Sequence, residues 1–224
     1  MTLLRYLCFS LAAGLCLAAC EKSDKNYKDF APNGENVYPG KVDSLKANPG
    51  KERIQLAWLL NTDPRIVKCR IFWNRKADSV EIAVSHKNSV DTIRHTLELG
   101  EGPYIFEVYT YNAEGDRSIK AEVNGDVFGN FYESGLLNRI LKSAVITGGD
   151  TKLEWEDADP RSPGVLLSYQ DQAGVAHTQL IPSEEKTTLL TGTPTTGTME
   201  FKTLYLPVAN AIDTFAAVTV KVDL

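Results

Sequence analysis

The chain carries the same strand and turn signature twice, about one small domain apart. The segments GKERIQLAW and GDTKLEW align with an offset of 97 residues. An Asp-Pro-Arg segment follows each of them, starting at Asp63 and at Asp159, an offset of 96. The aligned core residues are Leu56, Trp58, Leu153 and Trp155. Self-similarity at this spacing indicates one structural unit present twice, with a one-residue deletion in the second copy.

Within each copy, apolar residues alternate with polar ones in short runs, and turn clusters rich in Gly, Pro, Asn and Asp separate the runs. Alternation with a period of two is typical of half-buried β-strands. In the first copy the inward set is Ile54, Leu56, Trp58, Val67, Cys69, Ile71, Trp73, Val80, Ile82 and Val84. In the second copy, the third strand contains Val165, Leu167 and Tyr169, and the sixth contains Phe201, Thr203 and Tyr205. The pattern predicts an all-β chain built from sandwiches.

One stretch of the first copy resembles the sixth strand of a fibronectin type III domain, in which a Tyr opens the strand and Asn, Gly and Ser close the following turn. The matching residues are Tyr104, Phe106, Val108, Asn112, Gly115 and Ser118. Trp58 similarly fits the core Trp of this family's second strand. The resemblance implies two tandem fibronectin type III/immunoglobulin-like β-sandwiches. It also implies that Tyr104 forms a tyrosine corner, with a buried ring and a hydroxyl bonded to nearby backbone.

The N-terminus has the features of an export signal. A short charged start at Arg5 precedes an almost wholly apolar run too short to remain as a membrane span. The run ends in Leu-Ala-Ala-Cys at Cys20, which resembles the lipobox of bacterial lipoproteins and implies a lipid on Cys20. The alternative is a plain signal peptide with a Cys after two alanines. The expected organisation is a signal peptide at 1–19, lipidated Cys20 and tether at 20–36, a first sandwich at 37–125, a linker at 126–140 and a second, more degenerate sandwich at 141–224.

Charge and cysteine content limit the partners and the covalent chemistry. The chain has 24 Lys and Arg against 29 Asp and Glu, with no long cationic run, which argues against nucleic-acid binding. Cys8 and Cys16 would leave with the signal peptide and Cys20 would carry lipid. Cys69 would then remain alone, so we expect no intramolecular disulfide.

Segments spread over residues 38–139 resemble a narrower group, the domain of unknown function 4998 family. They read YPGKVDSL, AWL, DP, RIFWN, DSV, VFG and LLNR. The resemblance implies an exported lipoprotein of a glycan-degrading Gram-negative bacterium, often encoded near polysaccharide-utilisation genes. Many members add a discoidin-like carbohydrate-binding domain. This chain ends at Leu224, where we expect no third domain, so any affinity residing in that domain is not carried over.

The sequence offers little for catalysis, and we predict no enzyme, catalytic residue, metal or cofactor. The three histidines, His86, His95 and His177, lack metal-ligand spacing and are expected to face solvent. A carboxylate cluster surrounds Trp155. Its members are Glu154, Glu156, Asp157 and Asp159. A solvated face is favoured over a glycosidase pair or a calcium site, and cation binding stays open.

Three aromatic residues in the predicted linker are the candidate ligand-binding residues: Phe128, Phe131 and Tyr132. Such rings stack on sugars, but they also pack between domains, and both interpretations stay open. We expect a non-enzymatic, lipid-anchored lipoprotein of the outer membrane, on its cell-surface or periplasmic face, acting as an accessory binding protein in glycan capture. The alternative is a structural spacer or protein-binding adhesion module. Expected partners are the membrane, through the lipid, and a glycan or outer-membrane protein.

Overall fold

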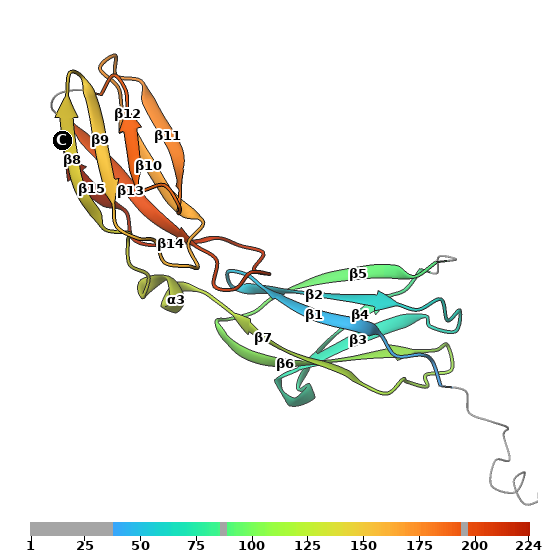
Figure 1. Ribbon diagram of the computed structural model, residues 1–224. Coiled ribbons are helices and arrows are strands. Elements are labelled where there is room, and N and C mark those ends of the chain that lie inside the picture. The colour runs from blue at the N-terminus through green and yellow to red at the C-terminus, as the bar shows by residue number, and fades with distance from the viewer. Residues whose placement is uncertain (1–37, 86–88, 194–196) are drawn as a thin grey trace, which may run out of the picture. The chain divides into compact units, whose positions relative to one another are not determined.

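The computed structural model describes residues 38–85, 89–193 and 197–224, and Pro39–Leu224 forms one compact unit (Figure 1). The predicted all-β fold with two tandem sandwiches is confirmed by the strand order below. The predicted signal peptide, Cys20 and the tether lie outside the described residues. No helix among the described residues is both long and apolar enough to cross a membrane.

The first sandwich contains seven antiparallel strands in two sheets. Its three-stranded sheet has the order β1-β2-β5 and its four-stranded sheet the order β4-β3-β6-β7. The strands are β1 (Asp43–Pro49), β2 (Arg53–Leu60), β3 (Lys68–Trp73), β4 (Asp78–Ala83), β5 (Asp91–Glu98), β6 (Gly102–Tyr111) and β7 (Ala121–Val127). A short 3-10 helix, η1 (Asn74–Lys76), joins β3 to β4. This division into two sheets matches the fibronectin type III fold implied by the sequence.

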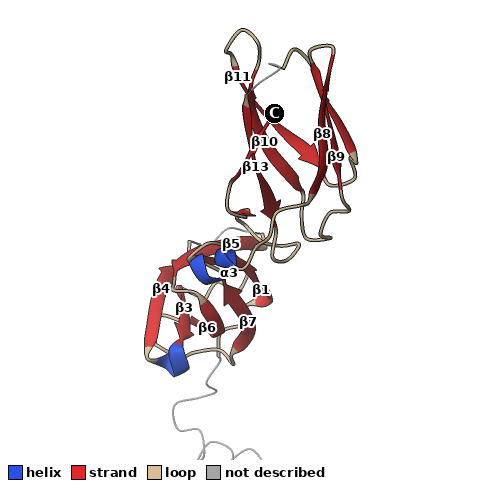
Figure 2. Ribbon diagram, turned by 90° about the vertical axis from the view of Figure 1, so that its left-hand side faces the viewer, coloured by secondary structure: helices blue, strands red, loops and turns tan. Residues whose placement is uncertain are grey.

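The second sandwich repeats this order, as Figure 2 shows, with β8 and β9 in one layer and β10, β11 and β13 in the other. Its strands are β8 (Leu141–Thr147), β9 (Asp150–Trp155), β10 (Gly164–Gln170), β11 (Ala176–Pro182), β12 (Thr187–Leu190), β13 (Thr198–Tyr205), β14 (Phe215–Ala216) and β15 (Val220–Asp223). Two short strands, β14 and β15, both pair with β13 and together take the place that β7 has in the first copy. The last strand of the second sandwich is therefore interrupted.

Each sandwich has its own core, centred on the predicted Trp. Trp58 is 1% exposed and Trp155 2% exposed, and they belong to separate clusters of buried residues. In register, Ile71 faces Val108 in the first copy. Leu167 faces Phe201 in the second, which confirms the predicted third and sixth strands.

One residue of the predicted inward set is placed differently. Val67 lies one position before β3 and is 40% exposed. The neighbouring Ile66 is fully buried and takes the core position at this end of the strand, so the Val67 side chain is left partly in solvent. The strand period was correct, and the strand begins one residue later.

The turn after the sixth strand explains the motif that resembles fibronectin type III domains. The Tyr104 hydroxyl donates to the Gly100 carbonyl at 2.9 Å, which confirms the tyrosine corner, although the ring is only half-buried. Asn112 Oδ1 accepts the Asp116 N–H at 2.7 Å, and Gly115 adopts a positive φ of 94°. These bonds close the turn locally, so the motif has a structural role.

Candidate functional site

The three candidate aromatic residues lie together but do not share one environment. Phe128 follows β7, and the other two belong to the short helix α3 (Asn130–Ser134). The rings of Phe128 and Tyr132 have centroids 4.8 Å apart, and they lie 5.9 and 5.2 Å from the ring of Phe215 in β14. Phe131 is 85% exposed. Packing therefore occupies two of the rings, and only Phe131 presents its ring to solvent; ligand binding by these residues stays a prediction.

A carboxylate that sequence reasoning missed holds α3 in place. Glu101, in the turn before β6, accepts the backbone N–H groups of Phe131 and Tyr132 at 2.8 Å each. These N–H groups belong to the first turn of the helix, which has no intrahelical partners for them. The bonds fix the direction in which Phe131 projects.

The loop between β13 and β14 contacts the turn between β1 and β2. Asp213 accepts two hydrogen bonds from the Arg53 guanidinium, at 2.8 Å from Nε and 2.6 Å from Nη2. It also accepts the Lys51 N–H at 2.8 Å, and the Ile212 N–H donates to the Pro49 carbonyl at 2.8 Å. The Arg53 guanidinium holds the pKa of Asp213 below its ordinary value. Backbone and side-chain bonds therefore tie the second sandwich to the first.

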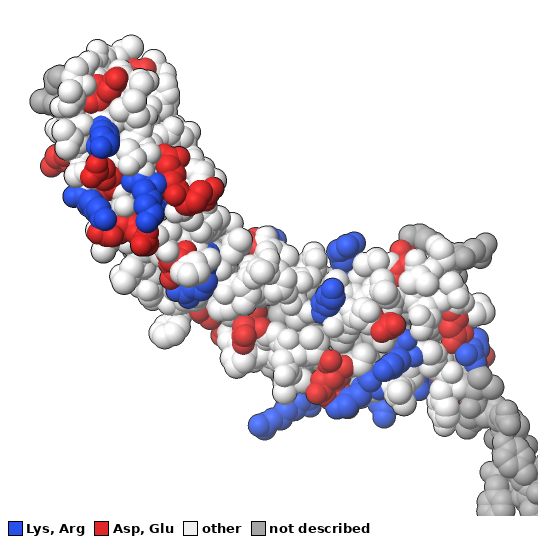
Figure 3. Space-filling view, viewed as in Figure 1, with Lys and Arg blue, Asp and Glu red and all other residues white. Residues whose placement is uncertain are grey.

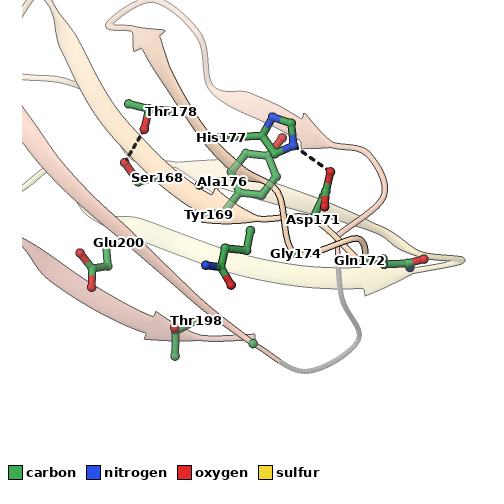
Figure 4. Close-up of a pocket in the computed structure, with 12 residues that line it drawn as sticks. Ser168, Tyr169, Asp171, Gln172, Gly174, Ala176, His177, Thr178, Thr198 and Glu200 are labelled. Atoms are coloured by element: carbon green, nitrogen blue, oxygen red, sulfur yellow. Dashed lines mark hydrogen bonds and ion pairs between the residues drawn. The ribbon is translucent and has the colours of Figure 1, made fainter.

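An open hollow of about 560 Å³ lies on the second sandwich, over β10, β11 and β13 (Figure 4). In register, Ser168 lies opposite Thr178 on one side and Glu200 on the other, so the three side chains share one face of the sheet. The Ser168 and Thr178 hydroxyls are 3.0 Å apart and form a hydrogen bond. Further lining residues are Gln170, Gln172, Ala176 and Thr198. The floor is therefore made of small and uncharged polar side chains, with Glu200 as an acidic exception.

An aromatic pair and a carboxylate stand at one end of this hollow. The Tyr169 and His177 rings stack, with centroids 5.2 Å apart and planes inclined by 24°. The His177 Nε2 atom lies 2.9 Å from Asp171 Oδ2, as the dashed line in Figure 4 marks. Asp171 also accepts backbone N–H bonds from Ala173 and Val175, and the His177 bond is the main cause of its lowered pKa. His177 was expected to face solvent in a hairpin after Gly174; it lies on β11, the second strand of the β10–β11 hairpin, where it is half-buried against Tyr169.

Of the other two histidines, only His95 is described, and it does not contribute to this surface. His86 lies outside the described residues. His95 lies on β5 of the first sandwich, where burial lowers the pKa of its imidazole. Across the described residues, no group of three His, Cys, Asp or Glu side chains is arranged to hold a metal ion. Cys69 is a free, buried thiol whose pKa burial raises to about 11.

The carboxylates around Trp155 each have a cationic partner of their own. Glu154 pairs with Lys152 at 2.7 Å and Glu156 with Lys142 at 3.1 Å. Asp157 lies 2.6 Å from Lys186. A hydrogen bond from Lys152 is the main cause of the lowered pKa of Glu154, and a hydrogen bond from Lys186 is the main cause of the lowered pKa of Asp157. A general acid in glycoside hydrolysis needs a raised pKa. The ion pairs of these carboxylates therefore favour a solvated, charged surface over a glycosidase pair.

The repeated Asp-Pro-Arg segment forms the same local clasp in both sandwiches. Arg65 donates to Asp63 from Nε and Nη2, each at 2.8 Å. Arg161 donates to Asp159 at 3.1 and 2.8 Å, and this pairing lowers the pKa of Asp159 to about 2. Asp63 also accepts the Gly40 N–H at 2.9 Å. The repeat thus closes a loop and has a structural explanation, as the sequence indicated.

Two solved structures of tandem fibronectin type III domains are similar to this chain. A two fibronectin type III domain segment of chicken tenascin is 11% identical with a TM-score of 0.33, and the match covers 83% of this chain and 99% of that one. The FN1-FN3 domains of chicken CNTN1 are 11% identical with a TM-score of 0.40, covering 84% of this chain and 69% of that one. No curated protein matches the chain significantly.

The family comparison extends over most of the sequence. The model of DUF4998, described as a domain of unknown function, matches residues 20–215. The matched range includes both sandwiches up to β14, so the likeness is not confined to one domain. The chain therefore belongs to the domain of unknown function 4998 family.

Proposed function

We propose that the protein is a lipid-anchored, non-enzymatic envelope lipoprotein that captures glycans through the second sandwich. The fibronectin type III-like fold and the family are compatible with a binding or structural module. The lipid on Cys20 is implied by its resemblance to a lipobox and would supply the membrane affinity. The residues after Cys20 would then act as a tether.

The observation that carries the proposal is the hollow over β10, β11 and β13. A polysaccharide presents many hydroxyl groups, and each of them can donate and accept hydrogen bonds. Hydroxyl and amide side chains do the same, unlike charged groups, which act in one direction only. Ser168, Thr178 and Thr198 offer hydroxyls, and Gln170 offers an exposed amide. Because these groups stand on paired strands, their positions are fixed before a ligand arrives.

The openness of this surface also fits an extended ligand. The hollow lies on the face of a sheet, so a chain can pass across it without needing an end to enter. Tyr169 and His177 also line the hollow, but they alternate with Ser168 and Thr178 along β10 and β11, so their rings project from the other side of the sheet and leave the hydroxyl face open. We therefore favour an internal segment of a neutral polysaccharide over a small molecule as the ligand.

The test is affinity electrophoresis of residues 21–224 in gels containing xylan, galactomannan or α-mannan. We expect at least one gel to retard the wild type, and Gln170→Ala to weaken retention about fivefold, the equivalent of one hydrogen bond of about 1 kcal/mol. Gln55→Ala is the matched control, since Gln55 lies on β2 of the other sandwich. Equal weakening by both variants, or no retardation of the wild type, contradicts glycan capture through this face.

A spacer or protein-binding module is the second candidate function, and the contacts of Asp213 favour it. A loop that bonds to the other sandwich through both backbone and a paired Arg resists bending between domains. Such stiffness suits a module that holds a partner at a fixed place. Capture of an outer-membrane protein by the chain, without retention by any glycan gel, decides for this alternative.

A further inference from the structure

The outer face of the four-stranded sheet in the first sandwich carries cations laid over aromatic rings. Lys68 Nζ lies 5.5 Å from the Tyr111 ring centroid, and the Arg70 guanidinium carbon lies 4.8 Å from the Phe72 centroid. In register, Lys68 faces Tyr111 and Arg70 faces Tyr109, so these side chains project from the same face of β3 and β6. Figure 3 shows Lys and Arg side chains gathered on the side of this sandwich where Figure 1 draws η1.

Tyr109 is the centre of this arrangement. It projects outward with Arg70, yet it is only 6% exposed, because other side chains cover it. The Lys76 ammonium lies 5.3 Å and the Arg117 guanidinium carbon 5.1 Å from its ring centroid. The Phe72 ring meets it edge-on at 5.8 Å. The Tyr109 ring thus contacts two cations, one from η1 and one from the loop after β6, and this brings the two charges close together.

The cations on this face outnumber the carboxylates. The cations are Lys68, Arg70, Lys76, Arg117 and Lys120, and the carboxylates are Glu81, Glu107, Glu122 and Asp126. Glu81 forms ion pairs with both Lys68, at 3.0 Å, and Arg70, at 3.6 Å. Glu107 pairs with Lys76 at 2.9 Å and also accepts the Tyr109 hydroxyl. The face is thus cationic in a chain whose net charge is -5.

Arg117 is the cation best placed to meet a ligand. It is exposed, and no carboxylate in the described ranges forms an ion pair with it. Its contact with the Tyr109 ring holds the guanidinium close to this face without neutralising its charge. A guanidinium held in this way can donate two parallel hydrogen bonds to one sulfate or carboxylate group.

We propose that this face, with Arg117 and Lys76 at its centre, binds a polyanionic saccharide that carries sulfate or carboxylate groups. Charge complementarity argues for this occupant, since an exposed guanidinium and a surplus of cations attract an anionic ligand. Residues two apart on a strand are about 6.6 Å apart, so Lys68 and Arg70 extend the cationic row along β3 and favour a ligand with repeated charges. This site is separate from the hollow on the second sandwich and does not depend on it.

The probe is dextran sulfate, with uncharged dextran as its matched control, in affinity electrophoresis of residues 21–224. We expect dextran sulfate to retard the wild type and dextran not to do so. Arg117→Gln should weaken retention about fivefold or more, and the retention should decline between about 0.05 and 0.3 M salt as charges are screened. If dextran sulfate fails to retard the chain, only this proposal fails. Retention by the uncharged polysaccharide gels tests the second sandwich separately, because those polymers do not depend on the cationic face.

The control variant is Arg94→Gln, which removes the same charge from β5 on the opposite sheet. It should leave retention within about 1.5-fold of the wild type. If Arg117→Gln unfolds the chain, Lys76→Gln replaces it, because Lys76 also contacts the Tyr109 ring; this variant should likewise weaken retention by dextran sulfate. Equal weakening by Arg94→Gln, or equal retention by both polymers, overturns the proposal. Sedimentation with phosphatidylglycerol vesicles that requires Arg117, without retention by dextran sulfate, assigns the face to a lipid surface and also overturns it.

Discussion

Replacing Asp213 with Asn should loosen the contact between the two sandwiches while leaving both cores intact. Asn keeps the size of the side chain and an oxygen that can accept the Lys51 N–H, but it removes the charge that faces Arg53. The side chain of Asp213 is 20% exposed and that of Arg53 is 42% exposed. The contact therefore lies between a buried and a surface ion pair.

The magnitude follows from these exposures. Hydrogen bonds to a charged group contribute about 1.5–3 kcal/mol when shielded, and exposed pairs contribute about 0–1 kcal/mol. Since more than a third of the Arg53 side chain is in water, we expect a loss of about 1–2 kcal/mol. For a chain of this size, that corresponds to a fall in Tm of about 2–8 °C.

Differential scanning calorimetry at pH 7 measures this change, with Asp43→Asn as the control. Asp43 lies on β1 and accepts the Ser44 N–H, but no described cation forms an ion pair with it. Its replacement should therefore shift Tm by less than about 1 °C. An unchanged Tm for Asp213→Asn contradicts the proposed role of this pair.

The pH dependence supplies a second check on the same residue. The pKa of Asp213 is lowered from an ordinary value of 3.8, mainly by the bond from Arg53. A lowered folded-state pKa means that the stabilisation is present above the unfolded value and is lost as pH falls through the folded one. The difference in Tm between wild type and Asp213→Asn should thus be complete at pH 7 and shrink below about pH 4. A difference that grows on acidification would refute the assignment.

Three further predictions concern the cores, the join and the N-terminus. Trp58→Ala should cost about 3–5 kcal/mol and melt the first sandwich before the second, which calorimetry would resolve as a separate transition; Trp155→Ala should do the reverse. Tyr132→Ala should lower Tm because it removes packing against Phe215, whereas Phe131→Ala should not, and equal effects would contradict the observed packing. Cys20→Ser should abolish labelling by radioactive palmitate and release the protein from membranes. A wild-type protein that takes up no palmitate label would contradict the lipoprotein interpretation.

The strands and the cores were accessible from the sequence because their signals are local. Strand geometry itself sets the alternation of apolar and polar residues around Trp58 and Trp155. The burial of both Trp side chains confirms the alignment of the two copies. The same holds for Asn112 and Gly115, whose side chain and conformation close a turn within a few residues. A signal of this kind needs no knowledge of distant partners.

The contact of Asp213 could not be predicted in this way. Its partner Arg53 is 160 residues distant, and the loop between β13 and β14 has no strand period. The hollow was missed for a different reason. Ser168 and Thr178 appear in the sequence as ordinary polar alternates of two strands, and only the pairing of β10 with β11 and β13 shows that small side chains share one face.

Tyr109 illustrates a further limit of pattern reasoning. Alternation correctly places Phe106 and Val108 inside, which puts Tyr109 on the outer face. There it is nevertheless buried, because Lys76 reaches over it from η1 and Arg117 from the loop after β6. Strand periodicity predicts the direction of a side chain, but not what covers it.

Amide chemical-shift mapping tests glycan capture by the second sandwich most directly. Isotope-labelled chain of residues 21–224 would be titrated with an oligosaccharide from whichever neutral polysaccharide retains it, up to about 10 mM. The predicted result is a set of saturable shifts in β10, β11 and β13, centred on Ser168, Gln170 and Thr178. Saturable shifts confined to other strands, or no shifts at the highest concentration, would contradict the proposal.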